Sequence, residues 1–337
     1  MVLNNLWFYM LKNKKKLYII TGVAGMVGST LLPRILSKKN IIVVGIDNLK
    51  LGKIKFIKKF LNKKNFIFLK LNLDKSIKNN KLNYLLNNHN LKEIWHLAAN
   101  SDIQAGTKNS RVDYRDTFLS TFNILNYIKP HIDENSKIIF SSSSAIYGNI
   151  GHKINEKSAP LMPESSYGAM KLASEAILSS YSFSNKIKSF IFRFPNVVGK
   201  NLTHGVIFDL SRKILLNVKE LNVLGNGQQC KPYSSVDEII DCMIYMTNVK
   251  NSKLVNFYNI GTNDKGVKVK DIVKLLVKKF DYKKKVVYEK NKIGWKGDIP
   301  AYSYSTKKIN NLGFKFKLNS ILALKKSINA ISKKTLF

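Results

Sequence analysis

The stretch LYIITGVAGMVG, residues 17–28, decides the fold of this chain. Its first part is a short apolar run, typical of a buried β-strand. Gly22, Gly25 and Gly28 then follow at intervals of three residues, and an amphipathic helical pattern begins. A glycine turn at a helix N-terminus lets backbone N–H groups approach a diphosphate, whose charge the helix dipole favours. We therefore predict a dinucleotide-binding turn here.

A second apolar strand, IIVVGID (41–47), ends in Asp47, about 25 residues after the first glycine. An acidic side chain at this place accepts hydrogen bonds from the adenosine ribose of a dinucleotide. Asp47 would repel the 2′-phosphate of NADP and so favours NAD, against the influence of Lys50 and Lys53 close by. The plainer interpretation is that the glycines only form tight turns in an ordinary α/β sheet.

Apolar runs of β type alternate with helical stretches along the first 195 residues. This alternation predicts βαβ units and an α/β fold with a doubly wound parallel (Rossmann) sheet, covered by helices on both faces. The runs are LYIIT (17–21), IIVVGI (41–46), FIFLKL (66–71), EIWHLA (93–98), KIIFSS (137–142) and KSFIFRF (188–194).

Beyond residue 195 the segments become shorter, with glycine turns such as LGNGQQ (224–229). We expect a smaller substrate lobe over the carboxyl ends of the strands, where ligands of α/β proteins bind. The run YNIGT (258–262) predicts a late strand that returns to the main sheet, so that the two parts interleave. The predicted organisation is an N-terminal extension (1–15), an NAD-binding domain (16–195, with a return segment at about 235–262) and a mainly substrate-binding lobe (196–337).

The chain has 337 residues, 45% of them hydrophobic, and a formal net charge of +36. That hydrophobic content suits a globular protein with a core. The 57 basic residues include few arginines, although arginine forks usually grip phosphates. The lysines are spread along the chain among many asparagines, so the charge indicates a solvated basic surface. Specific nucleic-acid binding is the less favoured interpretation.

Cys230 and Cys242 form neither a disulfide framework nor a metal-ligand pattern, which fits the reducing cytoplasm. No apolar run approaches the eighteen or so residues of a membrane span. The N-terminal stretch is not a secretory signal, because its lysines follow the apolar part; Met10 is an alternative start. His96 is expected to pack at a strand end, and the other histidines have no ligand spacing, so no metal is expected.

Tyr167 and Lys171 lie four residues apart in a helical pattern, SSYGAMKLASEAIL, so their side chains share one face. A nearby ammonium lowers the pKa of a tyrosine, which is about 10 when unperturbed. Such a tyrosine takes a proton from a sugar or alcohol hydroxyl as a hydride leaves. Ser143 ends a strand, where its hydroxyl would share the proton or hold the substrate oxygen. A Tyr–Lys pair alone is common by chance; the serine, the glycine turn and Asp47 make this one specific.

With these residues the chain resembles the extended short-chain dehydrogenase/reductase family, and within it the nucleotide-sugar epimerases and dehydratases. The resemblance covers roughly residues 16–320. It rests on TGVAGMVG (21–28), Asp47, HLAAN (96–100), SSSSAIYG (141–148), YGAMK (167–171), RFPNVVG (193–199), KPYSSVDE (231–238), YNIGT (258–262) and GDIPAY (297–302).

The resemblance implies a role for each matching residue. NAD would contact Gly22, Gly25, Met26, Val27, Gly28, Asp47, Asn48, Asn72, Leu73, Leu97, Ala98, Ala99, Tyr167 and Lys171. The catalytic residues would be Ser143, Tyr167 and Lys171. The nucleotide-sugar substrate would contact Ser143, Asn196, Lys231 and Tyr302, and the bulk of Tyr302 favours an unsubstituted hexose. Family members typically form homodimers through the helix near 111–128 and the helix starting at Tyr167.

Three departures from the family pattern matter. The family often has Asp-Ile or Asp-Val near the adenine, where Asn72-Leu73 stands here. Lysine stands at Lys231, and Trp295 or Lys296 near GDIP, where arginine is common, and this weakens the expected diphosphate grip. Dehydratases of the family carry an Asp-Glu pair directly after the catalytic serine or threonine, whereas Ser144 and Ala145 follow here, which argues against dehydration.

The resemblance therefore implies an NAD-dependent epimerase that inverts C4 of a nucleotide-diphosphate sugar through a transient 4-keto sugar. An NAD(P)H-dependent nucleotide-sugar reductase or dehydrogenase on the same fold is the alternative. A nucleic-acid-binding protein on this fold, suggested by the charge, is a more distant one.

Overall fold

The computed structural model describes residues 14–150, 153–292, 294, 299, 302–303 and 305–336. Residues 1–13 of the predicted extension lie outside these ranges, as do Trp295 and Lys296. The weakened diphosphate grip predicted for the GDIP segment is therefore untested.

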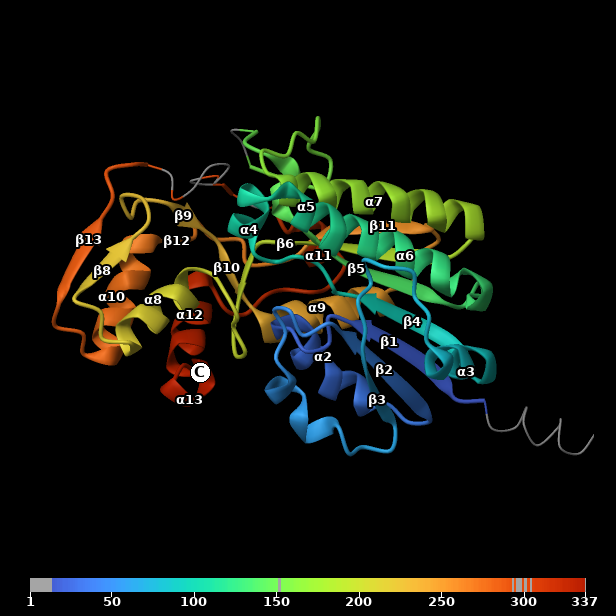
Figure 1. Ribbon diagram of the computed structural model, residues 1–337. Helices are drawn as coiled ribbons and strands as arrows, with labels where there is room; N and C mark the ends of the chain where they lie inside the picture. The colour runs from blue at the N-terminus through green and yellow to red at the C-terminus, as the bar shows by residue number, and fades with distance from the viewer. Residues whose placement is uncertain are drawn as a thin grey trace, which may run out of the picture.

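Seven parallel strands form the central sheet in the order β11-β6-β5-β4-β1-β2-β3 (Figure 1). The order reverses between β1 and β4, the switch point at which doubly wound sheets bind ligands. The predicted Rossmann sheet is thus confirmed. The strands are β1 (Lys16–Thr21), β2 (Ile41–Asp47), β3 (Phe66–Lys70), β4 (Asn90–His96), β5 (Lys137–Ser143), β6 (Lys188–Phe194) and β11 (Val255–Asn259).

The returning strand exists, but it lies earlier in the chain than predicted. The sequence pattern placed it at 258–262, whereas β11 runs from Val255 to Asn259 and pairs with β6 at the sheet edge. Gly261 adopts φ +151°, outside the range of a strand, so the chain leaves the sheet there. The glycine ends the strand instead of lying within it.

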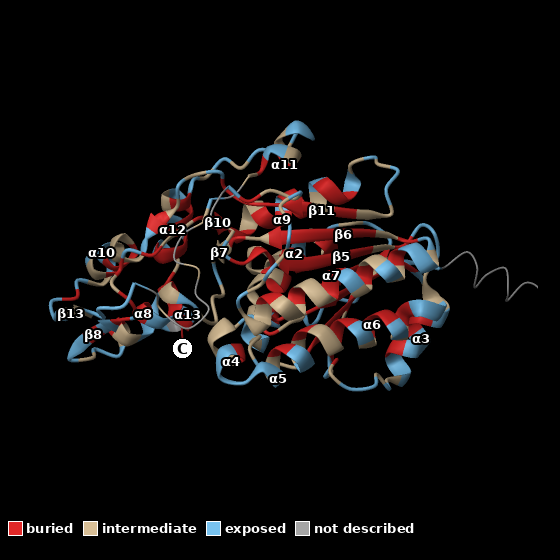
Figure 2. Ribbon diagram, turned by 90° about the horizontal axis from the view of Figure 1, so that it is seen from above, coloured by how far each residue is buried: buried red, intermediate tan, exposed pale blue. Residues whose placement is uncertain are grey.

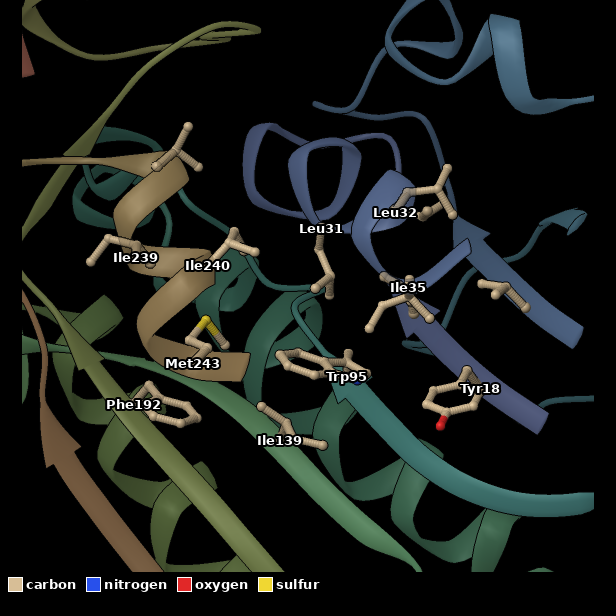
Figure 3. Close-up of a cluster of buried hydrophobic side chains, with 14 of the residues drawn as sticks. Tyr18, Leu31, Leu32, Ile35, Trp95, Ile139, Phe192, Ile239, Ile240 and Met243 are labelled. Carbon is tan, nitrogen blue, oxygen red and sulfur yellow. The ribbon is translucent and has the colours of Figure 1, made fainter. Parts of the chain in front are cut away.

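Helices cover both faces of the sheet, because successive strand residues point to opposite sides. Tyr18 and Ile20 of β1 pack with α2 (Met26–Leu36) and α9 (Val236–Asn248), as Figure 3 shows for Tyr18, Leu31, Ile35 and Met243. Leu17 and Ile19 face the other side. That side is covered by α3 (Asn80–Asn88), α6 (Ser120–Ile128) and α7 (Ser166–Asn185).

A run of short helices joins β4 to α6 on the side of the cleft. It comprises α4 (Ile103–Lys108), α5 (Ser110–Asp113) and the π-helix η3 (Tyr114–Leu119). The remaining short elements near the sheet are η1 (Ile54–Phe56), η2 (Lys58–Phe60), η4 (Lys129–His131), η5 (Ser144–Tyr147) and α11 (Lys307–Asn311). Across the described residues, no helix has the length and apolar character needed to cross a bilayer.

A smaller lobe with its own apolar cluster lies beyond the carboxyl ends of the strands (Figure 1). Between its segments the chain returns to the main sheet as α9 and β11, so the two parts interleave as predicted. In Figure 2 the red, buried residues follow both the central strands and the inner sides of the lobe helices. The domain limits at residues 195 and 196 stay a prediction. The lobe contains β7 (Asn196–Val198), α8 (Val206–Leu215), β8 (Glu220–Val223), β9 (Cys230–Lys231), β10 (Tyr233–Ser235), β12 (Val267–Lys268), α10 (Val269–Phe280), β13 (Lys285–Tyr288), α12 (Ser320–Asn329) and α13 (Lys333–Leu336).

Candidate active site

A cleft of about 850 Å³ lies between the carboxyl edge of the sheet and the smaller lobe. Every predicted site residue lines this cleft except Asn72. Asn72 is exposed, and its neighbours Leu71 and Leu73 line the cleft instead. Alternate residues of an extended segment point to opposite sides, so a contact from Leu73 argues against one from Asn72.

A side chain would meet different surroundings at each of the three glycines of the turn. Gly22 has φ +68°, and a Cβ there would lie 2.8 Å from the Ala98 nitrogen. A Cβ at Gly28 would lie 2.2 Å from the Gly22 oxygen, because α2 packs tightly on the turn. A Cβ at Gly25 would meet only the Gly22 oxygen, at 3.3 Å, and would otherwise extend toward the cleft.

The N-terminus of α2 is suited to an anion. Gly25 is the N-cap and offers no side-chain cap, and no acidic residue lies in the first turn. The first N–H groups of a helix, here those of Met26 and Val27, have no partner within the helix. Both residues line the cleft, so the turn fits the diphosphate of a dinucleotide.

Asp47 holds the second loop against the glycine turn. Its Oδ2 accepts a hydrogen bond from the Ala24 nitrogen at 2.9 Å, and its Oδ1 accepts one from the Leu49 nitrogen at 2.8 Å. Burial raises the pKa of this carboxyl, while the two main-chain hydrogen bonds lower it. Each oxygen retains a further lone pair, so the carboxylate can still accept from a ribose hydroxyl.

His96 is packed between two threonines. The Thr21 hydroxyl accepts from the nitrogens of Leu97 and Ala98, both at 3.1 Å, so its proton is directed to His96 Nδ1 at 2.8 Å. His96 Nε2 faces the Thr121 hydroxyl at 3.0 Å, and burial lowers the histidine pKa to about 3. The imidazole is therefore neutral, with its proton on Nε2. It fixes the Leu97–Ala98 wall of the cleft.

Ser143 and Tyr167 meet at the bottom of the cleft. Ser143 is the last residue of β5, and its hydroxyl accepts from the Ala145 nitrogen at 3.1 Å. The Ser143 hydroxyl lies near enough to Tyr167, in the first turn of α7, to lower the pKa of the phenol. The cap of that helix is Ser165, whose hydroxyl accepts from the Gly168 nitrogen at 3.1 Å. The strand end and the capped helix start thus place the two hydroxyls together.

Lys171 lies one helical turn beyond Tyr167, on the same side of α7. Its side chain is only 2% exposed, and Nζ donates to the Ser141 carbonyl oxygen at 2.6 Å. Nζ lies 5.9 Å from the centroid of the Tyr167 ring and 4.8 Å from that of Phe140. Burial lowers the pKa of this lysine to about 7, against the opposing effects of Glu175 and Asp113.

The expectation that Lys171 lowers the pKa of Tyr167 is wrong for the protein alone. Burial raises the pKa of Tyr167 to about 12, the nearby Ser143 hydroxyl opposes this, and the charge of Asp113 adds to it. Lys171 is itself close to losing its charge and is hydrogen-bonded to Ser141, so it does not outweigh burial. Formation of the phenolate needs further positive charge in the cleft.

A buried ion pair anchors the catalytic helix to the sheet. Arg193 of β6 makes two hydrogen bonds to Glu175 of α7, at 3.1 and 2.7 Å. Arg193 also donates to the Tyr147 hydroxyl at 2.7 Å, and Tyr147 donates to the Asn259 side-chain oxygen at 2.8 Å. Glu175 lies one turn after Lys171, so this network fixes the position of α7 along the sheet and with it that of Lys171.

The substrate side of the cleft contains the remaining predicted residues. Asn196 donates to the Pro232 carbonyl oxygen at 3.2 Å, next to Lys231. The Ser144 hydroxyl donates to the Tyr302 hydroxyl at 3.2 Å, which places Tyr302 beside the catalytic strand end. His204 and Arg212 also line the cleft, although the sequence analysis assigned neither a role. Within the described residues, no group of three or more His, Cys, Asp or Glu side chains could hold a metal ion.

A chain of charged side chains lies along the cleft, on the side of β2 and β3. Lys50 pairs with Asp116 of η3, and the Nε atom of Arg115 lies 3.0 Å from Asp116 and 3.1 Å from Asp74. Lys50 and Asp74 lie in the segments after β2 and β3, so the pairs join these two segments to η3. Lys50, Asp74 and Asp116 line the cleft. Sequence reasoning missed this chain, because no motif relates its members. We call these four residues the charge chain.

Comparison with known proteins agrees with this site. The sequence model of the NAD dependent epimerase/dehydratase family matches residues 18–261. A putative UDP-glucose 4-epimerase of Methanocaldococcus jannaschii is 25% identical over 316 residues, covering 92% of this chain and 97% of that protein. An uncharacterized UDP-glucose epimerase of Bacillus subtilis is 30% identical over 229 residues, covering 66% of this chain and 69% of that protein.

Solved structures resemble the fold over almost the whole chain. A UDP-glucuronic acid 4-epimerase from Bacillus cereus, in complex with UDP-glucuronic acid and NAD, superposes with a TM-score of 0.82 at 24% identity. The superposition covers 96% of this chain and 100% of the Bacillus cereus chain. A UDP-galactose 4-epimerase structure gives a TM-score of 0.81 at 24% identity, covering 95% and 99%. At this identity the likeness establishes the fold.

The Rossmann sheet, the glycine turn and the Ser–Tyr–Lys cluster define an enzyme of the short-chain dehydrogenase/reductase type. The chain belongs to the NAD dependent epimerase/dehydratase family. Its glycine turn, uncapped helix and buried acid fit NAD as the cofactor.

Proposed function

We propose that the protein inverts C4 of a nucleotide-diphosphate sugar, with a UDP-hexose as the first candidate. The observation that supports this most is the meeting of Ser143, Tyr167 and Lys171 in one cleft, between the glycine turn and the smaller lobe. The relatives named UDP-glucose 4-epimerase supply the substrate class and the position on the sugar. NAD, when bound, accepts a hydride from a sugar carbon and returns it.

Each residue of the cluster has one task in the proposed reaction. Tyr167 takes the proton of the 4-hydroxyl and gives it back, and Ser143 holds the same oxygen through its hydroxyl. Lys171 orders the site through its bond to the Ser141 carbonyl and supplies positive charge. Burial raises the Tyr167 pKa to about 12 in the protein alone, and the positive charge of the oxidised nicotinamide ring of bound NAD would favour the phenolate.

The same proposal includes cofactor contacts from the glycine turn, Asp47 and Leu73. It also includes substrate contacts from Asn196, Lys231 and Tyr302. All of them line the cleft, which supports the assignment. Ser144 and Ala145 occupy the positions after Ser143, and neither can act as the acid or base of a dehydration. Epimerisation is therefore favoured over loss of water.

The test is interconversion of UDP-glucose and UDP-galactose by the purified protein, followed by chromatography and repeated with other nucleotide sugars. Tyr167→Phe should lower the rate by at least about 10². Consumption of NADH in proportion to product would instead identify a reductase. No reaction with any UDP-, GDP-, dTDP- or CDP-sugar, with NAD supplied, would overturn the proposal.

A homodimer is the proposed assembly, formed by η3, α6 and α7 of each subunit. The two helices α6 and α7 lie side by side on one face of the sheet (Figures 1 and 2). Tyr114 (50% exposed), Phe122 (41%) and Phe183 (64%) lie on these elements, and a second copy of the chain would cover such apolar side chains. Phe122→Lys should convert a dimer into a monomer in analytical ultracentrifugation, and an unchanged sedimentation coefficient would contradict this surface.

The proposed compartment is the cytoplasm. Both cysteines are free, Cys242 in the core and Cys230 partly exposed, and neither needs an oxidising environment. Fractionation of cells that produce the protein, probed with an antibody, tests this assignment. Recovery in a secreted or membrane fraction would contradict it.

A further inference from the structure

Asp113 is a buried carboxylate next to the catalytic helix, outside the lining of the cleft. It is the last residue of α5 and is fully buried. Across the described ranges it makes no salt bridge, although a buried carboxylate without compensation is costly. Its Oδ1 accepts a hydrogen bond from Asn100, while its Oδ2 has no hydrogen-bond partner in the part of the chain that the structure describes.

The first partner of Asp113 is the loop after β4. Asn100 donates to Asp113 Oδ1 at 2.7 Å and to the Asp102 carbonyl oxygen at 2.8 Å, while its own oxygen accepts from the Asp102 nitrogen at 3.1 Å. Every polar atom of the Asn100 side chain is thus engaged. Asn100 lines the cleft, directly after the Leu97–Ala99 wall. Asp113 therefore fixes the loop on which that wall ends.

The second partner of Asp113 is the start of α7. Figures 1 and 2 place α4 and α5 beside the end of α7 that faces the smaller lobe. The Ser166 side chain, next to Tyr167, interacts with the carboxylate. The first turn of α7 contains no acidic residue of its own, so Asp113 supplies the negative charge that a helix N-terminus favours.

The packing around Asp113 leaves no room for a side chain at position 106. A Cβ on Gly106 of α4 would lie 1.8 Å from Asp113 Oδ2. Gly106 therefore makes the space in which the carboxylate sits. The titratable groups that interact electrostatically with it are Lys171 and Tyr167 from α7 and Asp116 from η3. Lys171 is the cation among them, and it too makes no salt bridge in the described part of the chain.

We propose that Asp113 is a positioning residue for the catalytic pair: its carboxylate is the counter-charge that keeps the Lys171 ammonium charged, and it locks the Asn100 loop against the first turn of α7. Glu175 is the other nearby acid, but Arg193 already compensates its charge through two hydrogen bonds. The directions of the pKa shifts agree, since Asp113 raises the pKa of both Lys171 and Tyr167. This inference rests on the proposed roles of Tyr167 and Lys171.

The isosteric variant Asp113→Asn removes the charge and retains an oxygen that can accept from Asn100. Without the carboxylate, Lys171 loses its proton at lower pH and the Tyr167 phenolate forms at lower pH. Both limbs of the pH–kcat profile of the NAD-loaded enzyme should therefore move to lower pH, by about one unit. Limbs that stay in place while kcat falls at every pH would mean a purely structural role and would overturn the proposal.

Gly106→Ala is the second variant, because its methyl group displaces the carboxylate without removing it. It should shift both limbs in the same direction, whereas Thr107→Ala, an exposed neighbour on α4, should not. Tyrosinate absorbance, titrated against a Tyr167→Phe background, reports the phenol directly even if turnover is lost. Full activity of Tyr167→Phe would refute the proposed function, while unshifted limbs in a folded Asp113→Asn or Gly106→Ala enzyme would refute this inference alone.

Discussion

The Nζ atom of Lys171 donates a 2.6 Å hydrogen bond to the main-chain carbonyl oxygen of Ser141. This bond ties the second turn of α7 to the end of β5, two residues before Ser143. It holds the start of α7 against the strand end, which brings Tyr167 close to Ser143. The lysine therefore acts as a joint between two elements as well as a charge.

Replacing Lys171 by methionine should affect both activity and stability. Methionine has a similar length but leaves the buried Ser141 carbonyl without its donor, which costs about 1–3 kcal/mol of unfolding free energy. The value of kcat should fall by roughly 10²–10⁴, as for loss of a group that assists proton transfer. Urea denaturation and steady-state kinetics measure the two effects. Lys58→Met, at an exposed position of η2, is the control and should change neither.

The glycines of the turn should separate folding from cofactor binding. Gly28→Ala forces a Cβ to 2.2 Å from the Gly22 oxygen and should destabilise the protein by at least about 3 kcal/mol. Gly25→Ala has only one contact, at 3.3 Å, so the protein should fold, but its methyl group enters the anion site. We expect it to bind NAD at least about tenfold more weakly. Thermal melting and the bound nucleotide content distinguish the two, and equal effects would contradict the assignment.

The neutral His96 should make the protein less stable in acid. Its pKa is about 3 in the folded protein and about 6.5 when unfolded, so between these values the unfolded chain binds more protons. The contribution of His96 to stability is therefore fully present above pH 6.5 and is lost as the pH falls toward 3, by up to about 1.4 kcal/mol per unit. His96→Gln should show a shallower slope in urea titrations between these limits. Parallel slopes would contradict a neutral imidazole.

The charge chain should slow the release of NAD. Its pairs join the segments after β2 and β3 to η3 along the cleft. Lys50→Gln removes one link, and we expect NAD to dissociate several times faster, with the difference shrinking at high salt because exposed pairs are screened. Displacement of bound NAD by a fluorescent analogue measures the rate. The exchange Lys50→Asp with Asp116→Lys should restore slow release, and a failure to do so in a folded protein would exclude this pairing.

Much of the architecture could be read from local patterns. The six strand runs, the glycine turn and the spacing of Tyr167 and Lys171 all lie within short segments, where hydrophobic periodicity and backbone sterics act directly. The returning strand was predicted at 258–262 but runs from Val255 to Asn259. The sequence does not show that Gly261 has a positive φ, which a strand residue does not adopt. Of the neighbours Asn72 and Leu73, both assigned to the cofactor, only Leu73 lines the cleft, since sequence position does not say which side of a segment faces it.

The sequence by itself determined the sheet, the glycine turn and the candidate catalytic side chains Ser143, Tyr167 and Lys171, because each lies in a short segment with its own local pattern. Tertiary structure alone decided their electrostatics. Burial, which sequence spacing cannot measure, raises the pKa of Tyr167 to about 12 and lowers that of Lys171 to about 7. The fold also brings Asp113 and Asn100 next to α7, although they are distant from it in the sequence. Desolvation and long-range charge depend on such neighbours, which only folding assembles.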